Sequence, residues 1–99
     1  MANEQITVAV RIKAKPETRA EVREELHKLL APTRKEKGCI NYDMHVAKDD
    51  DCLFLFYENW TSEGDLNQHL AAPHVQHWIN LAQTLLAEPM ELSLWRKLD

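Results

Sequence analysis

Residues 53–60 read LFLFYENW, a run that is apolar from Leu53 to Tyr57 and then ends in Glu58, Asn59 and Trp60. A strand that is apolar on both faces is typical of one that is covered on both sides. Just before it, residues 40–47 alternate apolar and polar side chains, and the acidic turn at residues 49–51 separates the two runs. Two such runs joined by a short polar loop predict an antiparallel hairpin.

The segments on either side of this hairpin supply the other predicted elements. They are a strand over residues 6–14, a helix opened by the capping box of Thr18 and Glu21 and ending near residues 32–38, a short helix capped by Thr61 or Ser62 and running through Leu70, a longer helix from Pro73, and a last strand after Pro89. The order βαββαβ predicts an α+β fold: a ferredoxin-like antiparallel sheet with both helices on one face. Residues 1–99 are expected to form a single domain.

This fold leaves one face of the sheet without a helical cover. The run from Leu53 to Tyr57 is nevertheless apolar on both faces, so its second face needs a cover that this chain does not supply. A second copy is the simplest candidate. We therefore expect a homodimer whose sheets meet face to face.

Charge and hydropathy limit the possible partners of the protein and its expected location in the cell. The chain has 12 basic and 16 acidic residues, a net charge of −4, and no basic cluster, so nucleic acid is not an expected partner. No apolar run approaches the ~20 residues that span a bilayer, and the N-terminus MANEQITV does not resemble a leader, so we expect no membrane partner and a cytoplasmic location. Cys39 and Cys52 open the two strands of one hairpin and should lie roughly 20 Å apart, as free thiols.

The candidate catalytic residues are Glu58 and His69. In a symmetric hairpin Ile40 lies near Trp60 and Tyr42 near Glu58, which sets a phenol beside a carboxyl on an apolar face. Such a carboxyl tends toward a raised pKa and could act as a general base or acid. The alternative is a structural glutamate satisfied by Tyr42 or by backbone. His69, at the seam between helix and sheet, could shuttle a proton or simply bond a carbonyl.

The candidate substrate-binding residues are Tyr42, Trp60, Arg11, His74 and Trp78. Trp60 and Trp78 could stack on a planar ligand or pack in the hydrophobic core or at an interface. Arg11, centred in the first strand, could hold an oxyanion or cover apolar surface with its stem. His74 and His77 have a metal-ligand spacing, but further ligands are not evident nearby, so no metal is expected. Phosphate-loop and dinucleotide fingerprints are missing from the sequence, so no cofactor is expected.

Several stretches resemble the antibiotic biosynthesis monooxygenase (ABM) domain of the dimeric α+β barrel superfamily. They are the opening strand at residues 6–15, Glu36-Lys37-Gly38-Cys39 before Tyr42, Phe56-Tyr57-Glu58-Asn59-Trp60, and His69-Leu70-Ala71-Ala72-Pro73-His74. The resemblance implies a homodimer with a pocket between sheet and helices in each subunit. Haem-degrading relatives use an Asn on the first strand and a Trp on the second helix. Here Ala9 or Arg11 and His69 stand at those positions, which argues against haem.

The resemblance also implies chemistry. Family members include cofactor-independent oxygenases of quinols and anthrones and an isomerase of a phosphorylated signal sugar. Our first hypothesis is an oxygenase of a small quinol- or polyphenol-like aromatic, in which His69 or Glu58 is the base. Tyr42 and Trp60 would hold the substrate, and Arg11 would steady an oxyanion. The alternatives are an isomerase of a small phosphorylated metabolite and a non-catalytic binding or stress-response module.

Overall fold

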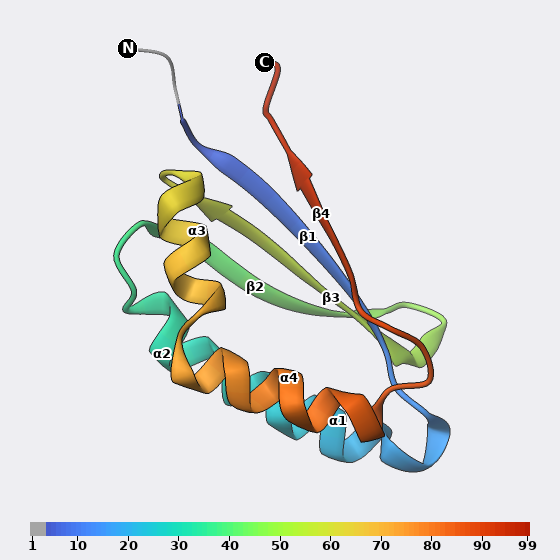
Figure 1. The fold of residues 1–99 in the computed structure, drawn as a ribbon. Coiled ribbons are helices and arrows are strands. Elements are labelled where there is room, and N and C mark those ends of the chain that lie inside the picture. Colours follow the sequence, from blue (N-terminus) through green and yellow to red (C-terminus); the bar gives the residue numbers. More distant parts are fainter. Residues whose placement is uncertain (1–3) are drawn as a thin grey trace.

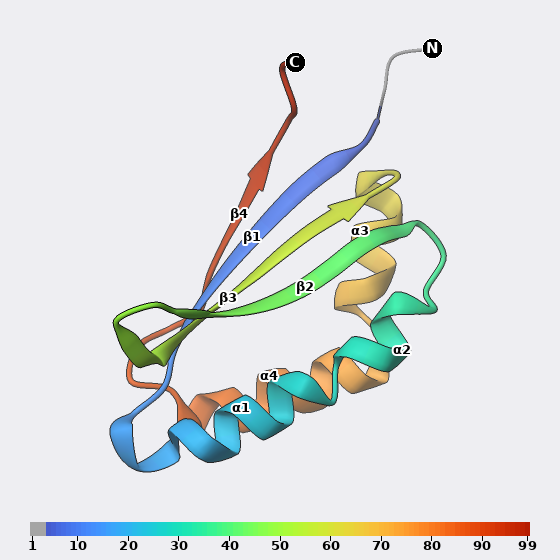
Figure 2. The ribbon, with the colours of Figure 1, turned by 180° about the vertical axis from the view of Figure 1, so that it is seen from behind.

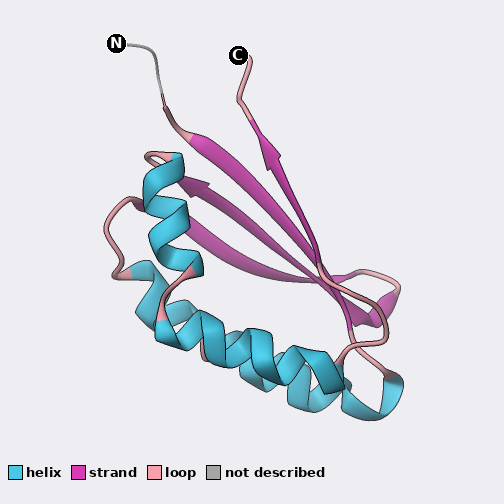
Figure 3. Ribbon diagram, viewed as in Figure 1, coloured by secondary structure: helices cyan, strands magenta, loops and turns pink. Residues whose placement is uncertain are grey.

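The computed structural model of this protein describes residues 4–99 and contains one four-stranded antiparallel sheet with helices packed against it (Figure 1, Figure 3). The elements are β1 (Ile6–Lys13), the 3₁₀ turn η1 (Pro16–Thr18), α1 (Arg19–His27), α2 (Leu30–Arg34), β2 (Cys39–Ala47), β3 (Asp50–Trp60), α3 (Glu63–Leu70), α4 (Pro73–Leu85) and β4 (Glu91–Trp95). The predicted βαββαβ order is confirmed. The first helical segment, predicted as one helix, is divided into α1 and α2, and the second consists of two helices, α3 and α4, as predicted.

The sheet order is β2-β3-β1-β4, which places β3 and β1 in the centre. The predicted hairpin register is confirmed where it matters for the site, because Tyr42 pairs with Glu58 and Met44 with Phe56. It is wrong at the end of the hairpin, where Cys39 rather than Ile40 lies opposite Trp60. An irregularity between Cys39 and Asn41 inserts a residue there, as in a β-bulge, and Ile40 is left exposed.

The two faces of the sheet have different surroundings. All the helices lie on one side, here called the inner face, and the views from front and back agree on this (Figures 1 and 2). The inner face carries Val8, Phe54, Phe56, Glu58 and Trp60, all buried. On the opposite, outer face Leu55 and Tyr57 are 40% and 45% exposed. The prediction that one apolar face lacks a cover within the subunit is therefore confirmed, and the homodimer stays a prediction.

Capping residues predict the starts of two helices, and the structure confirms one of these caps but not the other. Ser62 caps α3 as expected, since its Oγ accepts a hydrogen bond from the backbone N–H of Asp65 at 3.1 Å. The predicted capping box at Thr18 is wrong. Its hydroxyl donates instead to the carbonyl of Leu85 at 2.6 Å, which ties the start of α1 to the end of α4. The hydroxyl therefore donates to a tertiary acceptor, the Leu85 carbonyl, and does not accept from a local backbone N–H of α1.

The loop between α2 and β2 is held tightly against α3. Gly38 in this loop has φ +83°, a left-handed conformation that favours glycine. A Cβ added there would lie 2.3 Å from Oδ2 of Asp65, so the contact with α3 also requires glycine. The carbonyl of Gly38 accepts a hydrogen bond from the N–H of Thr61 at 2.9 Å. This loop also carries Glu36, whose carboxylate contacts His69 of α3.

Cys39 and Cys52 are both free thiols, as predicted. Within residues 4–99, none of the helices has the length and apolar character needed to cross a bilayer. The cytoplasmic location stays a prediction.

Candidate functional site

A small, mostly apolar cavity of about 100 Å³ lies between the inner face of the sheet and the helices. Its lining residues are Val10, Ile12, Leu29, Tyr42, Phe56, Glu58, His69, Leu70, Val75, Trp78, Ile79, Met90 and Leu92. Among them only Tyr42, Glu58 and His69 carry a titratable group. An apolar cavity with a few convergent polar groups is the usual form of a small-molecule site.

A larger groove of about 640 Å³ runs between α1 and β2, and we do not assign the site to it. It is open, and its charged side chains include Arg23, Arg34, Glu24 and Asp43. Arg34 forms an ion pair with Asp43 at 3.6 Å, and both side chains are about half exposed. Exposed charges of mixed sign are typical of ordinary solvated surface. The smaller cavity brings buried titratable groups together and is the better candidate.

Glu58 lies on the inner face near the end of β3 and is only 3% exposed. Residues two apart on a strand share a face, so Trp60 reaches it, and the indole Nε1–H donates to Oε1 of Glu58 at 2.9 Å. Burial raises the pKa of Glu58 to about 7, with the charge of Glu36 acting in the same direction and the indole hydrogen bond opposing both. A carboxyl with this pKa can exchange a proton near neutral pH.

His69 lies in the last turn of α3 and is 3% exposed. Its ring is packed by aromatic neighbours, with centroid distances of 4.7 Å to Trp60 and 5.4 Å to Tyr42. Nδ1 lies 2.6 Å from Oε1 of Glu36. Burial lowers the pKa of His69, and the hydrogen bond to Glu36 opposes this shift. The burial therefore favours a neutral imidazole, which can accept a proton.

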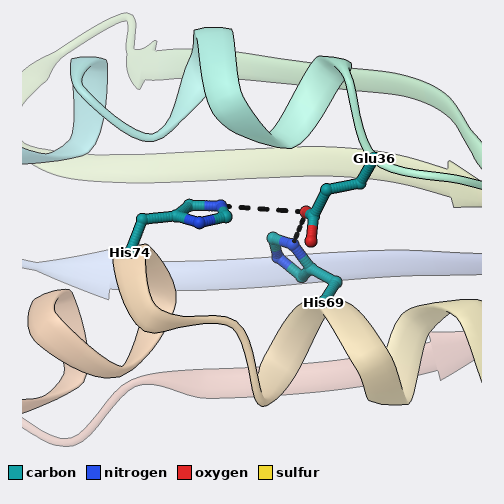
Figure 4. Close-up of side chains that lie close together, drawn as sticks. All are labelled: Glu36, His69 and His74. Atoms are coloured by element: carbon teal, nitrogen blue, oxygen red, sulfur yellow. Dashed lines mark hydrogen bonds and ion pairs between the residues drawn. The ribbon is translucent and has the colours of Figure 1, made fainter.

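Glu36 contacts a predicted catalytic residue but is not itself among the site residues predicted from the sequence. It reaches His69 from the loop before β2 and approaches His74 of α4 from the same oxygen, 3.7 Å from Nε2 (Figure 4). Its stretch carries part of the family resemblance, but its spacing does not predict contact with a helix 33 residues away. The signal that could have found it is Gly38, because a glycine ending a short loop indicates a close approach of the backbone to another element.

Glu36, His69 and His74 also raise the question of a metal ion, because their ligand atoms lie within 4.8 Å of one another. An ion held at about 2.1 Å by both Glu36 and His69 would keep those two donor atoms about 3 Å or more apart. The observed separation is 2.6 Å. This arrangement is therefore that of a charge-assisted hydrogen bond, and the absence of a metal cofactor stays a prediction.

Two of the predicted substrate-binding residues line the cavity. The ring of Tyr42 stacks on Phe56 at a centroid distance of 4.6 Å, and burial raises the pKa of its hydroxyl above the usual range, so Tyr42 remains a hydrogen-bond donor. Trp78 contributes from α4, and its Nε1–H lies 3.3 Å from the sulfur of Met90.

The other three do not line it. Trp60 is 0% exposed and lies behind Glu58 as part of the core. Nε2 of His74 is hydrogen-bonded to the hydroxyl of Thr33, at 3.0 Å. Arg11 is on the outer face, paired with Glu88 at 2.6 Å, because strand residues alternate between faces and Val10 takes the inner one. The prediction that Arg11 lies beside the substrate is therefore corrected: within the subunit, the Arg11 side chain is on the face of the sheet away from the cavity.

The sequence and fold were compared with known proteins. The family model described as antibiotic biosynthesis monooxygenase matches residues 5–81. An uncharacterized protein of Synechocystis sp. is 32% identical over 95 residues, which are 96% of this chain but only 65% of the relative. The chain thus spans about two thirds of that protein. The Mycobacterium tuberculosis protein "Putative monooxygenase Rv0793" is 31% identical over 94 residues, which are 95% of this chain and 92% of the relative.

Solved structures agree with the sequence comparisons. The structure of the M. tuberculosis protein Rv0793 superposes with a TM-score of 0.91 at 27% identity and covers 96% of each chain. The crystal structure of PA3566 from Pseudomonas aeruginosa gives a TM-score of 0.91 at 28% identity, covering 97% of this chain and 96% of the other. The likeness therefore extends over the whole fold, including the elements that bound the cavity.

Proposed function

Because this chain belongs to the antibiotic biosynthesis monooxygenase family, we propose that it is a monooxygenase of a small quinol- or polyphenol-like aromatic and uses neither metal nor flavin. The observation that carries the proposal is the placing of Glu58, His69 and Tyr42 on the wall of an otherwise apolar cavity between the sheet and the helices. A buried base and a phenolic donor are the groups needed to ionise a phenol away from water.

The chemistry needs no external reductant. A base removes the proton of a phenolic hydroxyl, and the resulting electron-rich ring carbon reacts with O₂. One oxygen atom enters the substrate, the other leaves as water, and conversion of the quinol to a hydroxyquinone supplies all four electrons. The apolar walls at Phe56, Leu70 and Trp78 favour a flat, uncharged ring and keep water from the intermediate.

The cavity wall also weighs against the isomerase alternative. A phosphorylated substrate needs several convergent cations. Within residues 4–99, the side chains that line the cavity include no Lys or Arg, and Arg11 lies on the other face of the sheet. A neutral aromatic fits this wall better than a phosphate ester.

The test is oxygen uptake with a panel of hydroquinones, comparing wild type with His69→Ala and Glu58→Gln. We expect wild type to consume O₂ and the His69 variant to lose about 100-fold or more in kcat, because proton transfer by a positioned group contributes about that much. Thr61→Ala, a change at an exposed position outside the cavity, is the control. Equal uptake by all the proteins, or none by any, would count against the proposal.

We further propose that two subunits associate through their outer sheet faces. Leu55 and Tyr57 on central β3 and Trp95 on edge β4 are 40%, 45% and 59% exposed in the subunit. Because β3 and β4 flank β1, these side chains lie on one continuous surface. An exposed apolar patch of this kind typically marks an interface.

Light scattering coupled to size-exclusion chromatography tests the association. We expect wild type at twice the subunit mass at micromolar concentration. The double variant Leu55→Asp with Tyr57→Asp should run as a monomer, because two buried unpaired charges per subunit would oppose association. Leu98→Asp, at a 95% exposed position, should keep the wild-type mass. A monodisperse wild-type monomer would refute the homodimer.

A further inference from the structure

The two ring nitrogens of His69 have different surroundings. Nδ1 lies 2.6 Å from Oε1 of Glu36, and Glu36 is not among the residues that line the cavity. The lone-pair positions of Nδ1 and Nε2 point away from each other across the imidazole ring, so Nε2 points away from Glu36, and His69 itself lines the cavity. Within residues 4–99, Nε2 has no hydrogen-bonding partner.

We propose that Glu36 is a positioning residue that keeps the hydrogen of neutral His69 on Nδ1 and so leaves the lone pair of Nε2 free as the general base. An ionised carboxylate only accepts hydrogen bonds, so Nδ1 must donate to it. The proposal rests on the proposed function and chooses His69 over Glu58 as the base. The substrate O–H bond breaks, its proton goes to Nε2, and the electron pair stays on the substrate oxygen. The carboxylate of Glu36 then stabilises the imidazolium that forms.

The protein holds both members of this pair rigidly. The backbone of Glu36 is bonded on both sides, since its N–H donates to the carbonyl of Thr33 at 2.9 Å and its carbonyl accepts from Cys39 at 3.2 Å. The buried ring of His69 packs against the rings of both Trp60 and Tyr42. A base held by a second, fixed group meets its substrate in one orientation, which is the geometric requirement for proton transfer.

Glu58 is less suited to the same task. Its Oε1 already accepts the indole hydrogen of Trp60. Its raised pKa also means that a substantial fraction of Glu58 carries a proton near pH 7. Four titratable groups surround His69. The carboxylate of Glu36 lies outside the cavity, and Glu58 and Tyr42 lie on its wall. The ring of His74 on α4 is 6.0 Å from the ring of His69, centroid to centroid.

The tautomer can be measured in the free protein, without a substrate. Long-range ¹H–¹⁵N correlation spectra at pH 8 distinguish a protonated from an unprotonated ring nitrogen, and His69→Gln identifies the signals of His69 among the five histidines. We expect wild type to carry the hydrogen on Nδ1, and Glu36→Ala to lose this preference because the acceptor is gone. Glu24→Gln, at an exposed carboxylate on α1, should leave the spectrum unchanged. Hydrogen on Nε2 in wild type, or an unchanged tautomer in Glu36→Ala, would overturn the proposal.

A kinetic arm separates the role of Glu36 from the function of the site. With a hydroquinone that wild type oxidises, Glu36→Gln should lower kcat about 100-fold with KM nearly unchanged, and Glu36→Asp should recover part of the loss. An effect on KM alone would overturn the positioning role. If wild type consumes no O₂ with any hydroquinone, the proposed function fails, while the tautomer measurement still decides whether Glu36 orients His69.

Discussion

Replacing Trp60 by alanine is expected to destabilise the protein by about 3–5 kcal/mol, the usual cost of emptying a buried aromatic site. Trp60 is fully buried at the end of β3 and packs beside His69. Its indole is also the hydrogen-bond donor to Glu58, so the substitution leaves a buried carboxyl without its partner. This loss would be a large part of the ~5–15 kcal/mol that typically stabilises a domain. Urea unfolding at fixed protein concentration measures it.

The matched variant is Trp60→Phe, which keeps most of the ring and removes only the N–H. We expect a smaller loss, about 1–2 kcal/mol, from the missing hydrogen bond. Because that bond lowers the pKa of Glu58, its removal should raise the pKa above about 7. A Trp60→Ala protein within about 1 kcal/mol of wild type would contradict the assignment of Trp60 to the core.

The stability of the wild-type protein should depend on pH through Glu58. Its pKa is raised from 4.5 to about 7 in the folded state, so between these values the folded protein holds a proton that the unfolded chain has released. The stability from Glu58 is therefore complete below pH ~4.5 and is lost as pH rises through about 7. A shift of this size corresponds to roughly 3 kcal/mol. Urea unfolding at a series of pH values from 4 to 8 measures the slope.

The control isolates Glu58 from the other groups that titrate in this range. The lowered pKa of His69 acts with the opposite sign, because a depressed histidine adds stability as pH rises. Glu58→Gln should remove the Glu58 contribution alone and be more stable than wild type at pH 8, since a neutral amide can still accept from Trp60. The exposed Glu24→Gln should keep the wild-type profile. Identical slopes in wild type and Glu58→Gln would show that Glu58 is not the group responsible.

Half of the site was predictable because it depends on local rules. Strand alternation and the pairing of a hairpin place Tyr42 beside Glu58, and the register confirms this pair. Ser62 and Pro73 set the starts of α3 and α4. These signals act between residues close in sequence or related by one turn.

The other half depends on which elements meet in space. Alternation puts Arg11 and Val10 on opposite faces, but it does not say which face the helices cover. The sequence alone therefore does not reveal that Arg11 is on the face away from the cavity. Glu36 meets His69 only because the loop before β2 packs against α3 through Gly38. Hydrophobic periodicity therefore determined the strands, helices and their order. The packing of distant segments decided which carboxylate and which imidazole share a proton, because such contacts depend on the tertiary fold and not on spacing along the chain.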